Sequence, residues 1–438
     1  MQQKKAHEPS PEIAHLIDDI TASPTPYHAV ARASQLLDEA GFSEVERDRV
    51  FPSEPGNYFV VDGGTLIAWI QPKTWSGFTI VGAHTDSPNL RVRRNPDIET
   101  AGFGQVGVEI YGGVLLNSWI DRDLGVAGRT HVRTNDGIQE RLVLDDQPVL
   151  RIPQLAIHLD QSIKRDGLKL DAQKHMVPIW TTSPSPDRSF RSYVAELADC
   201  SEDDLVSWDL MAFDTQKPTV AGRDKELFVS ARIDNLFSSF AGVRALCSLD
   251  HDARLDGQRL ANMPVLALFD HEEVGSTSAT GADGSYLVAT LERIALAGGQ
   301  QRQEFLAAMA ASFVLSADGA HATHPNYASK HDPSHPIRLN QGVVIKKNAN
   351  HRYATEARGE SAIIELCNQA DIPHQFYVHR NDLRCGSTIG PATAAQLGAT
   401  TADIGAPQLA MHSIRETAGV EDFAHLCALM RHCWTNQP

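Results

Sequence analysis

The sequence has no apolar run that approaches the roughly 18 residues a membrane-spanning helix needs. Its N-terminus, MQQKKAHEPSPEIAHLIDDI, contains two lysines but lacks the apolar core and the small-residue cleavage site of a signal peptide. We therefore expect neither a membrane segment nor a signal peptide, and a cytoplasmic location.

Cysteine is scarce and scattered. The chain contains six cysteines and no C-x-x-C pair. This usage fits free thiols in a reducing cytosol better than a disulfide framework or a zinc site built from thiolates. The six positions, each interpreted as a small buried side chain, are Cys200, Cys247, Cys367, Cys385, Cys427 and Cys433.

Basic residues are outnumbered by acidic ones. Lys and Arg total 39 against 55 Asp and Glu, so the formal net charge is −16. Nucleic acids and anionic membranes attract basic surfaces, and this balance argues against either as the main partner. The remaining composition, with 42% hydrophobic and 21% charged residues, is typical of a soluble globular protein, and 438 residues are enough for two domains.

Helix and strand patterns alternate in the outer parts of the chain. Ser10-Pro11 and Thr25-Pro26 are typical helix starts, and the second helix is expected to stop at Gly41. Strands are predicted over residues 65–70 and 78–82 and over LFVSARID (227–234), MPVLALFD (263–270) and SFVLSAD (312–318), with a helix over LFSSFAGVRALCSL (236–249). Such alternation predicts a mostly parallel sheet with helices on both faces.

The middle of the chain has a different texture. From about residue 95 to 222, short alternating segments such as VGVEIYGG and ERLVLDD are broken by Gly, Asn and Asp, as in antiparallel β structure. A polar stretch at 184–217 lacks strong strand periodicity. We therefore divide the chain into a first domain made of residues 1–94 and 223–438 and a β-rich domain, 95–222, inserted into it.

Several predicted strands end in a side chain that can bind a metal ion. Ligands of open α/β sheets bind outside the carboxyl ends of the strands, so these residues are expected to converge. A further imidazole, His412, lies near the C-terminus. Carboxylate and imidazole without thiolate suit zinc, manganese or cobalt better than calcium, and one carboxylate can bridge two ions about 3.5–4 Å apart. The strand-end candidates are His84, Asp86, Asp234, Glu272, Glu273 and Asp318.

Each part of this pattern also has a structural interpretation. An H-x-D motif such as His84–Asp86 is often a turn, and two adjacent glutamates are usually solvated. Asp234 could cap the following helix, and His412 could be a structural histidine. The hypothesis of a metal site rests on their occurrence together at successive strand ends. There, two adjacent glutamates in an extended segment would point to opposite sides, so that one binds metal while the other takes a proton from an attacking water.

Seven motifs, in this order, resemble the aspartyl aminopeptidase family of dinuclear metallopeptidases, from about residue 10 to the C-terminus. They are SPTPYHAV (23–30), GAHTDSPNLRV (82–92), ARIDNL (231–236), DHEEVGSTSATGA (270–282), SADGAHATHPNY (316–327), NDLRCGSTIGP (381–391) and DIGAPQLAMHSIRE (403–416).

The resemblance implies a role for each candidate residue. One metal ion would be held by His84 and Asp318, the other by Glu273 and His412, with Asp234 bridging. Glu272 would be the general base, and Asp86 would orient His84. The two ions would be zinc, with manganese or cobalt as alternatives. The implied fold is a three-layer α/β/α domain interrupted by a smaller, mainly β dimerisation domain, assembled from dimers into a tetrahedral dodecamer.

Three further residues are substrate-binding candidates through the same resemblance. His158, in IPQLAIHLD, matches a segment that extends towards a neighbouring subunit's active site, and its alternative is an ordinary strand histidine. Lys346 would pair with an acidic side chain of the substrate, although Lys347 beside it competes for that role and a solvated lysine is the usual alternative. His321 would contact the substrate or support Asp318.

The expected function is removal of N-terminal residues, aspartate or glutamate by preference, from peptides. One alternative is an aminopeptidase that prefers neutral residues. Others are a carboxypeptidase or deacylase with the same metal geometry, and a catalytically silent, peptide-binding cage of the same fold.

Overall fold

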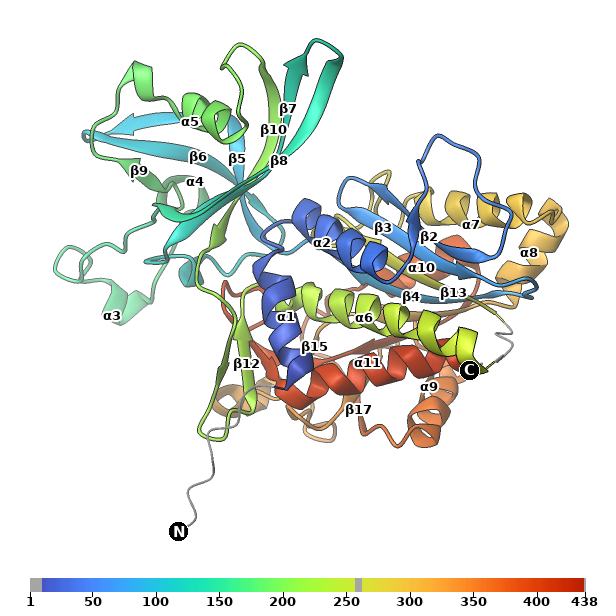
Figure 1. Ribbon diagram of the computed structural model, residues 1–438. Coiled ribbons are helices and arrows are strands. Elements are labelled where there is room, and N and C mark those ends of the chain that lie inside the picture. Colours follow the sequence, from blue (N-terminus) through green and yellow to red (C-terminus); the bar gives the residue numbers. More distant parts are fainter. Residues whose placement is uncertain (1–9, 257–261, 437–438) are drawn as a thin grey trace, which may run out of the picture. The chain divides into compact units, whose positions relative to one another are not determined.

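The computed structural model describes residues 10–256 and 262–436, which form two compact units (Figure 1). One unit comprises the described residues up to Asp86, Pro218–Met411 and those from Glu416 onward. The other consists of Ser87–Lys217 together with the short segment His412–Arg415. Within these described ranges, no helix has the length and apolar character needed to cross a bilayer. The dimerisation role predicted for residues 95–222 stays a prediction.

The first unit is built on a mixed sheet of nine described strands. Their order is β1-β2-β3-β13-β4-β14-β18-β16-β17. Five of the eight neighbouring pairs are parallel and three are antiparallel, which confirms the mostly parallel sheet. In sheet order the strands are β1 (Ser43–Glu44), β2 (Gly56–Asp62), β3 (Thr65–Gln71), β13 (Met263–Phe269), β4 (Phe78–His84), β14 (Phe313–Ala317), β18 (Thr400–Gly405), β16 (Val343–Lys347) and β17 (His374–Val378).

Helices cover both faces of this sheet. Leu66 and Ala68 of β3 belong to one hydrophobic core, whereas Ile67 and Trp69 belong to another. Successive side chains of a strand point to opposite faces, so the sheet separates the two cores. The first core includes residues of α1 (Pro11–Thr21), α2 (Pro26–Glu39), α6 (Ile233–Asp256), α9 (Ala357–Gln369) and α11 (Val420–Thr435); the second includes residues of α7 (Tyr286–Ala297), α8 (Arg302–Ala310) and α10 (Ile389–Leu397). The predicted three-layer arrangement is confirmed.

The predicted helix starts are confirmed. The side chain of Ser10 accepts a hydrogen bond from the backbone N–H of Ile13, and that of Thr25 accepts one from the backbone N–H of His28. Both caps satisfy a backbone donor that the first helical turn leaves without a partner. Helix α2 ends at Glu39, and Gly41 then adopts a φ of 86° in the left-handed region that favours glycine.

The segment LFVSARID contains a strand, as predicted, but the strand is shorter than the segment and lies outside the mostly parallel sheet. Strand β12 (Leu227–Ser230) pairs antiparallel with β11 (Thr219–Ala221) and β20 (Glu416–Gly419). These strands form a separate sheet with β19 (Pro407–Leu409) and β15 (Ala320–His321). Arg232 interrupts the extended backbone with a φ of 57°, so β12 ends at Ser230, and Asp234 stands at the start of α6 with non-helical backbone angles, φ −79° and ψ 104°.

The second unit contains an antiparallel sheet of six described strands. Their order is β8-β7-β10-β5-β6-β9. The strands and helices are β5 (Asn89–Thr100), β6 (Phe103–Tyr111), β7 (Leu124–Thr134), β8 (Gly137–Leu150), β9 (Ile179–Thr181), β10 (Leu205–Asp214), α3 (Ile163–Asp166), α4 (Ala172–His175) and α5 (Phe190–Leu197). The reading of 184–217 as a stretch without strong strand periodicity misses β10, an interior strand. Its polar positions are paired across the sheet, for example Asp209 with Arg129 at 2.8 Å, and so hide the alternation.

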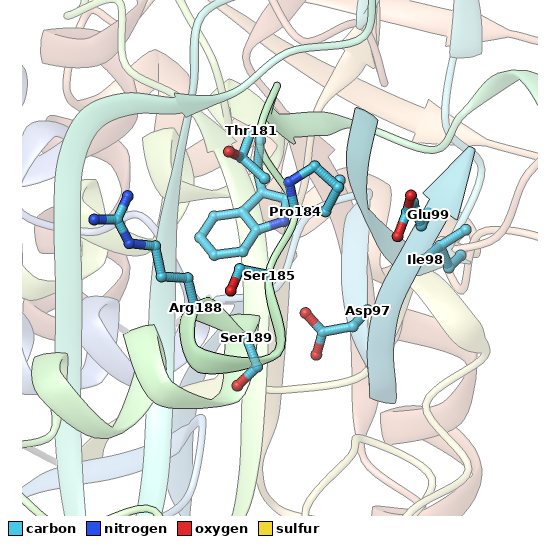
Figure 2. Close-up of a pocket in the computed structure, with 10 residues that line it drawn as sticks. Asp97, Ile98, Glu99, Thr181, Pro184, Ser185, Arg188 and Ser189 are labelled. Atoms are coloured by element: carbon cyan, nitrogen blue, oxygen red, sulfur yellow. The ribbon is translucent and has the colours of Figure 1, made fainter. Parts of the chain in front are cut away.

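A cavity of about 290 Å³ lies beside α5 in this second unit (Figure 2). Its lining includes Asp97 of β5 and Trp180 of β9. Oδ1 of Asp97 accepts a hydrogen bond from the backbone N–H of Phe190 at 2.7 Å, and the Trp180 and Phe190 rings meet edge to face. These contacts fix the start of α5 on the sheet.

Candidate metal centre

His84 and Asp86 lie at the carboxyl end of β4 in the first unit. Their side chains are 1% and 0% exposed. Nδ1 of His84 lies 3.0 Å from the backbone carbonyl oxygen of Asp86 and 3.4 Å from Oδ1 of the same residue. Because a carbonyl oxygen only accepts, Nδ1 carries a proton, and Nε2 is the nitrogen left to bind a metal ion. This is the tautomer that a metal ligand at Nε2 requires.

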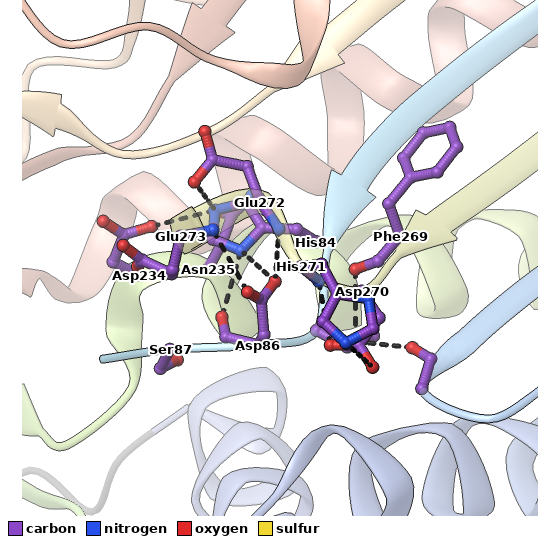
Figure 3. A network of polar contacts seen from close by, with 12 residues as sticks. His84, Asp86, Ser87, Asp234, Asn235, Phe269, Asp270, His271, Glu272 and Glu273 are labelled. Carbon is purple, nitrogen blue, oxygen red and sulfur yellow. Dashed lines mark hydrogen bonds and ion pairs between the residues drawn. The ribbon is translucent and has the colours of Figure 1, made fainter. Parts of the chain in front are cut away.

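The Asp86 carboxylate also fixes the turn that carries both glutamates. Oδ1 accepts the backbone N–H of Glu272 and Oδ2 that of Glu273, each at 3.1 Å (Figure 3). A carboxylate that accepts two backbone N–H groups makes charge-assisted hydrogen bonds, which are stronger than neutral ones. Asp86 thus holds the end of β4 and the segment after β13 in a fixed relation.

The two glutamates lie in a 3-10 turn, Glu272–Val274, and not in an extended segment as the sequence pattern suggested. His271 before the turn and Gly275 after it have φ values of 67° and 100°, so the backbone turns sharply as β13 ends. Successive residues of a 3-10 helix are about 120° apart around the axis. The two side chains therefore leave the backbone in different directions, yet a carboxylate oxygen of each lies within 4.8 Å of the other and of a ring nitrogen of His84.

Three carboxylates surround Nε2 of His84. The distances from Nε2 are 3.2 Å to Oδ1 of Asp234, 3.5 Å to Oδ1 of Asp318 and 3.9 Å to Oε2 of Glu272. The possible ligand atoms of His84, Asp234 and Asp318 lie within 4.8 Å of one another, and so do those of His84, Glu272 and Glu273. Residues from 84 to 318 in the sequence therefore meet beside the carboxyl ends of β4, β13 and β14.

This cluster concentrates negative charge away from water. Burial is the main cause that raises the pKa of Glu272 to about 8; the charge of His84 opposes this shift, and the carboxylates of Asp318, Asp86 and Asp234 add to it. Burial and then Asp234 raise the pKa of Glu273 well above its usual range. Burial lowers the pKa of His84, but hydrogen bonds to Asp234 and other carboxylates outweigh it and raise the pKa well above 6.5.

Divalent cations suit this arrangement. Several carboxylates in one buried cluster repel one another, and at neutral pH they either hold protons or gain a cation. The donor set combines one imidazole nitrogen with carboxylate oxygens, which suits zinc, manganese or cobalt. Among the described residues, those near His84 therefore fit the predicted metal site.

Three residues that support the cluster escaped the sequence analysis. Glu416 accepts a hydrogen bond from the backbone N–H of Asp234 at 2.9 Å. Asn235 Nδ2 donates to the carbonyl oxygen of Ala317 at 2.8 Å, and the Asp234–Asn235 peptide bond is cis. Ser239 Oγ donates to the carbonyl oxygen of His84 at 2.7 Å. Each of these side chains bonds to a backbone atom, and a sequence does not reveal such a bond. Only Glu416, a buried acidic residue next to Arg415 in the motif DIGAPQLAMHSIRE, could have been noticed from the sequence.

His412 and His158 belong to the second unit. Nδ1 of His412 lies 3.1 Å from the carbonyl oxygen of Gly113. His158 is exposed in the segment between β8 and α3, which is a turn and not a strand. The ligand role of His412 and the substrate role of His158 stay predictions.

Lys346 and His321 lie close to Asp318 in the first unit. Lys346, in β16, is 1% exposed, and its Nζ lies 3.1 Å from the carbonyl oxygen of Gly319 and 3.9 Å from Oδ2 of Asp318. Lys347 instead pairs with Glu360 at 2.5 Å and is partly exposed. Burial, together with the charge of Lys346, lowers the pKa of His321 to about 4, so its imidazole is neutral at pH 7.

Comparison with known proteins gives a family. A model of the family "Aminopeptidase I zinc metalloprotease (M18)" matches residues 20–434. A probable M18 family aminopeptidase 2 from Streptomyces coelicolor is 47% identical over 417 residues, covering 94% of this chain and 95% of the relative. The corresponding protein of Mycobacterium tuberculosis is 46% identical over 423 residues, covering 95% and 96%.

Solved structures share the fold of this chain. A chain from a cryo-EM structure of an Ape4 and Nbr1 complex is 37% identical, with a TM-score of 0.93, covering 97% of this chain and 85% of that one. A chain of the mApe1 dodecamer from S. cerevisiae is 28% identical, with a TM-score of 0.84, covering 96% of each.

Proposed function

This chain belongs to the M18 family of zinc metallopeptidases and is therefore a metallo-aminopeptidase, and we propose that it removes acidic N-terminal residues from peptides with the help of two divalent metal ions. The observation that carries the proposal is the convergence of His84, Asp234 and Asp318 with the adjacent pair Glu272 and Glu273. A buried cluster of this composition has no evident structural purpose without a cation.

The proposed ligand sets follow the family resemblance and the observed neighbours. His84 and Asp318 hold one ion, Glu273 and His412 hold the other, and Asp234 bridges them. Support comes from Nε2 of His84, which lies 3.2 Å from Oδ1 of Asp234 and 3.5 Å from Oδ1 of Asp318. The ions are zinc in the first instance, in keeping with the family description.

Glu272 acts as the general base and then the general acid. Bound divalent ions supply Lewis-acid polarisation of the scissile carbonyl and lower the pKa of a nearby water. Glu272 takes a proton from the attacking water as the water oxygen bonds to the carbonyl carbon. The carbon–nitrogen bond then breaks, and Glu272 returns the proton to the leaving amine. The hydrogen bonds between Asp86 and the backbone of the glutamate turn keep the Glu272 carboxylate in place for both transfers.

The preference for aspartate or glutamate is assigned to Lys346. A net charge of −16 repels acidic peptides at long range, so a preference for them must come from local positive charge. The Lys346 Nζ lies 3.1 Å from the Gly319 carbonyl oxygen, 3.9 Å from Oδ2 of Asp318 and 5.1 Å from the centroid of the Tyr353 ring, so this buried cation stands beside the cluster, where it would attract a substrate carboxylate. A preference for neutral residues is the alternative that substrate profiling decides.

The proposed assembly is a homo-oligomer, a tetrahedral dodecamer built from dimers, acting on peptides in the cytoplasm. A relative's structure is described as a dodecamer. The segment around His158 supports an assembly of this kind because Leu155, Ile157 and Leu159 expose 56%, 47% and 75% of their surface. Apolar side chains gathered in this way are typical of a surface that another subunit covers.

Two variants and a substrate panel test the proposal. Glu272→Gln should keep the wild-type metal content and lose most turnover, because the amide cannot take a proton. Asp234→Ala should lose metal as well as turnover.

Aspartyl, glutamyl and leucyl substrates and a peptide with a blocked N-terminus separate the alternatives. Near-normal turnover of the Gln variant would remove Glu272 from its role, a leucyl preference would refute the acidic assignment, and cleavage of the blocked peptide would favour a carboxypeptidase or deacylase. Full metal with no turnover of any substrate would favour the silent cage.

A further inference from the structure

Gly113 touches the imidazole of His412 in two different ways, both within the second unit. Its carbonyl oxygen lies 3.1 Å from Nδ1 of His412. Its α-carbon faces the same ring, so that a β-carbon placed on Gly113 would stand 2.8 Å from Nδ1 and 3.3 Å from Cε1. One residue therefore restrains both the protonation and the orientation of the ring.

The carbonyl contact selects one tautomer of His412. A carbonyl oxygen accepts but cannot donate, so Nδ1 carries the proton and the lone pair is on Nε2. Histidines that bind metal through one nitrogen usually donate the other N–H to a carbonyl or carboxylate, which fixes the ring and raises its basicity. The same relation holds at His84, whose Nδ1 faces the carbonyl of Asp86.

The missing side chain of Gly113 makes room for the ring. The φ of Gly113 lies outside the left-handed range, so alanine fits the backbone at this position without strain. A separation of 2.8 Å is shorter than real β-carbons tolerate. Glycine is therefore needed here for space next to the imidazole and not for its conformational freedom.

The backbone around His412 is held in place, so the ring cannot avoid an added methyl group by sliding away. The carbonyl oxygen of His412 accepts from the backbone N–H of Leu115 at 3.2 Å. The backbone N–H of Ile414 donates to Ser118 Oγ at 3.0 Å, and the Ile414 side chain is 5% exposed in the core of this unit. A methyl group at position 113 must therefore rotate the imidazole and lengthen its contact with the carbonyl.

We propose that Gly113 is a positioning residue for His412: its carbonyl sets the tautomer and its lack of a side chain sets the ring orientation that presents Nε2 to a metal ion. This inference rests on the proposed role of His412 as a ligand. It assigns to the motif VGVEIYGG a purpose beyond forming a strand.

The test measures zinc affinity of the purified full chain by competition with a chromophoric chelator after metal removal. Gly113→Ala should lower the affinity for one of the two zinc ions about 10- to 100-fold, which is the usual effect of removing a partner that orients a ligand. The melting temperature of the metal-free variant should match that of the wild type. Gly298→Ala is the matched control, because Gly298 has a φ of −71° and an added β-carbon would meet only atoms at 3.5 Å.

A double-mutant cycle with His412→Ala completes the experiment. If Gly113→Ala acts through the imidazole, the double variant should have the same zinc affinity and melting temperature as His412→Ala alone. This comparison remains informative if Gly113→Ala by itself folds poorly. Wild-type affinity in Gly113→Ala, or a double variant that is worse than His412→Ala, overturns the inference. Full zinc content in His412→Ala overturns the proposed ligand set instead, so the two failures are distinguishable.

Discussion

Replacing Asp86 with asparagine tests whether one carboxylate organises the whole cluster. The substitution keeps the size of the side chain and removes its charge. In the native protein the two oxygens of Asp86 accept the backbone N–H groups of Glu272 and Glu273, each at 3.1 Å. Asparagine has one oxygen for these two donors, and its NH₂ group meets the other N–H donor to donor.

The expected size of the effect follows from these contacts. A hydrogen bond to a charged group contributes about 1.5–3 kcal/mol, and a buried N–H left without an acceptor costs about 1–3 kcal/mol. Asp86 is fully buried, so water cannot replace the lost acceptor. Displacement of the glutamate turn should weaken metal affinity and turnover about 10- to 100-fold, as is usual for a residue that orients metal ligands.

Asp422→Asn is the matched control. Asp422 is 1% exposed, and its two oxygens also accept two backbone N–H groups, those of Asn340 at 2.7 Å and Gly342 at 3.1 Å. The control should lose a similar amount of unfolding free energy in urea but keep its zinc affinity. Equal zinc affinity and turnover in Asp86→Asn and wild type would refute the reasoning, and equal losses in both variants would reduce the effect to general destabilisation.

Two more predictions concern protons and selectivity. Zinc affinity should rise with pH between 6 and 8. The raised pKa values of the proposed ligands His84 and Glu273 mean that these groups hold protons that a metal ion must displace, and fewer protons remain as pH increases. A chelator competition series that is flat with pH would contradict this. Lys346→Met should lower kcat/KM for an aspartyl substrate at least tenfold more than for a leucyl substrate, since methionine has a similar length but no charge. Lys347→Met is the control and should leave the ratio of the two kcat/KM values unchanged, because Lys347 pairs with Glu360. An unchanged ratio in Lys346→Met would show that Lys346 does not determine specificity.

Uninterrupted apolar strands made part of this architecture predictable. Residues of β4, β13 and β14 are all buried, so the sequence gives long hydrophobic runs, and the polar side chains after them mark the strand ends. His84 and Asp318 could be placed for that reason. Asp234 was expected at a strand end, whereas β12 ends at Ser230 and Asp234 stands at the start of α6 with non-helical backbone, where its side chain lies in the same cluster.

Other features of the site carry no pattern that a sequence reveals. The carbonyl group of Asp86 contacts the imidazole of His84, but every residue has a carbonyl group, so the side chains give no sign of this contact; the contact of Gly113 with His412, within the second unit, is unmarked for the same reason. The 3-10 turn at Glu272–Val274 follows left-handed backbone at His271, a conformation that few residues other than glycine adopt. Strand β10 is obscured because its ion-paired polar residues resemble those of a loop.

The segment His412–Arg415 has a consequence for anyone exchanging modules between related enzymes. Four residues near the C-terminus pack with the inserted unit: Ile414 enters its core, and Arg415 Nη1 lies 2.9 Å from the carbonyl oxygen of Gln216. A chimera that replaces only residues 87–217 would change the residues that these four residues contact. A chimera should therefore exchange residues 87–217 and 412–415 together.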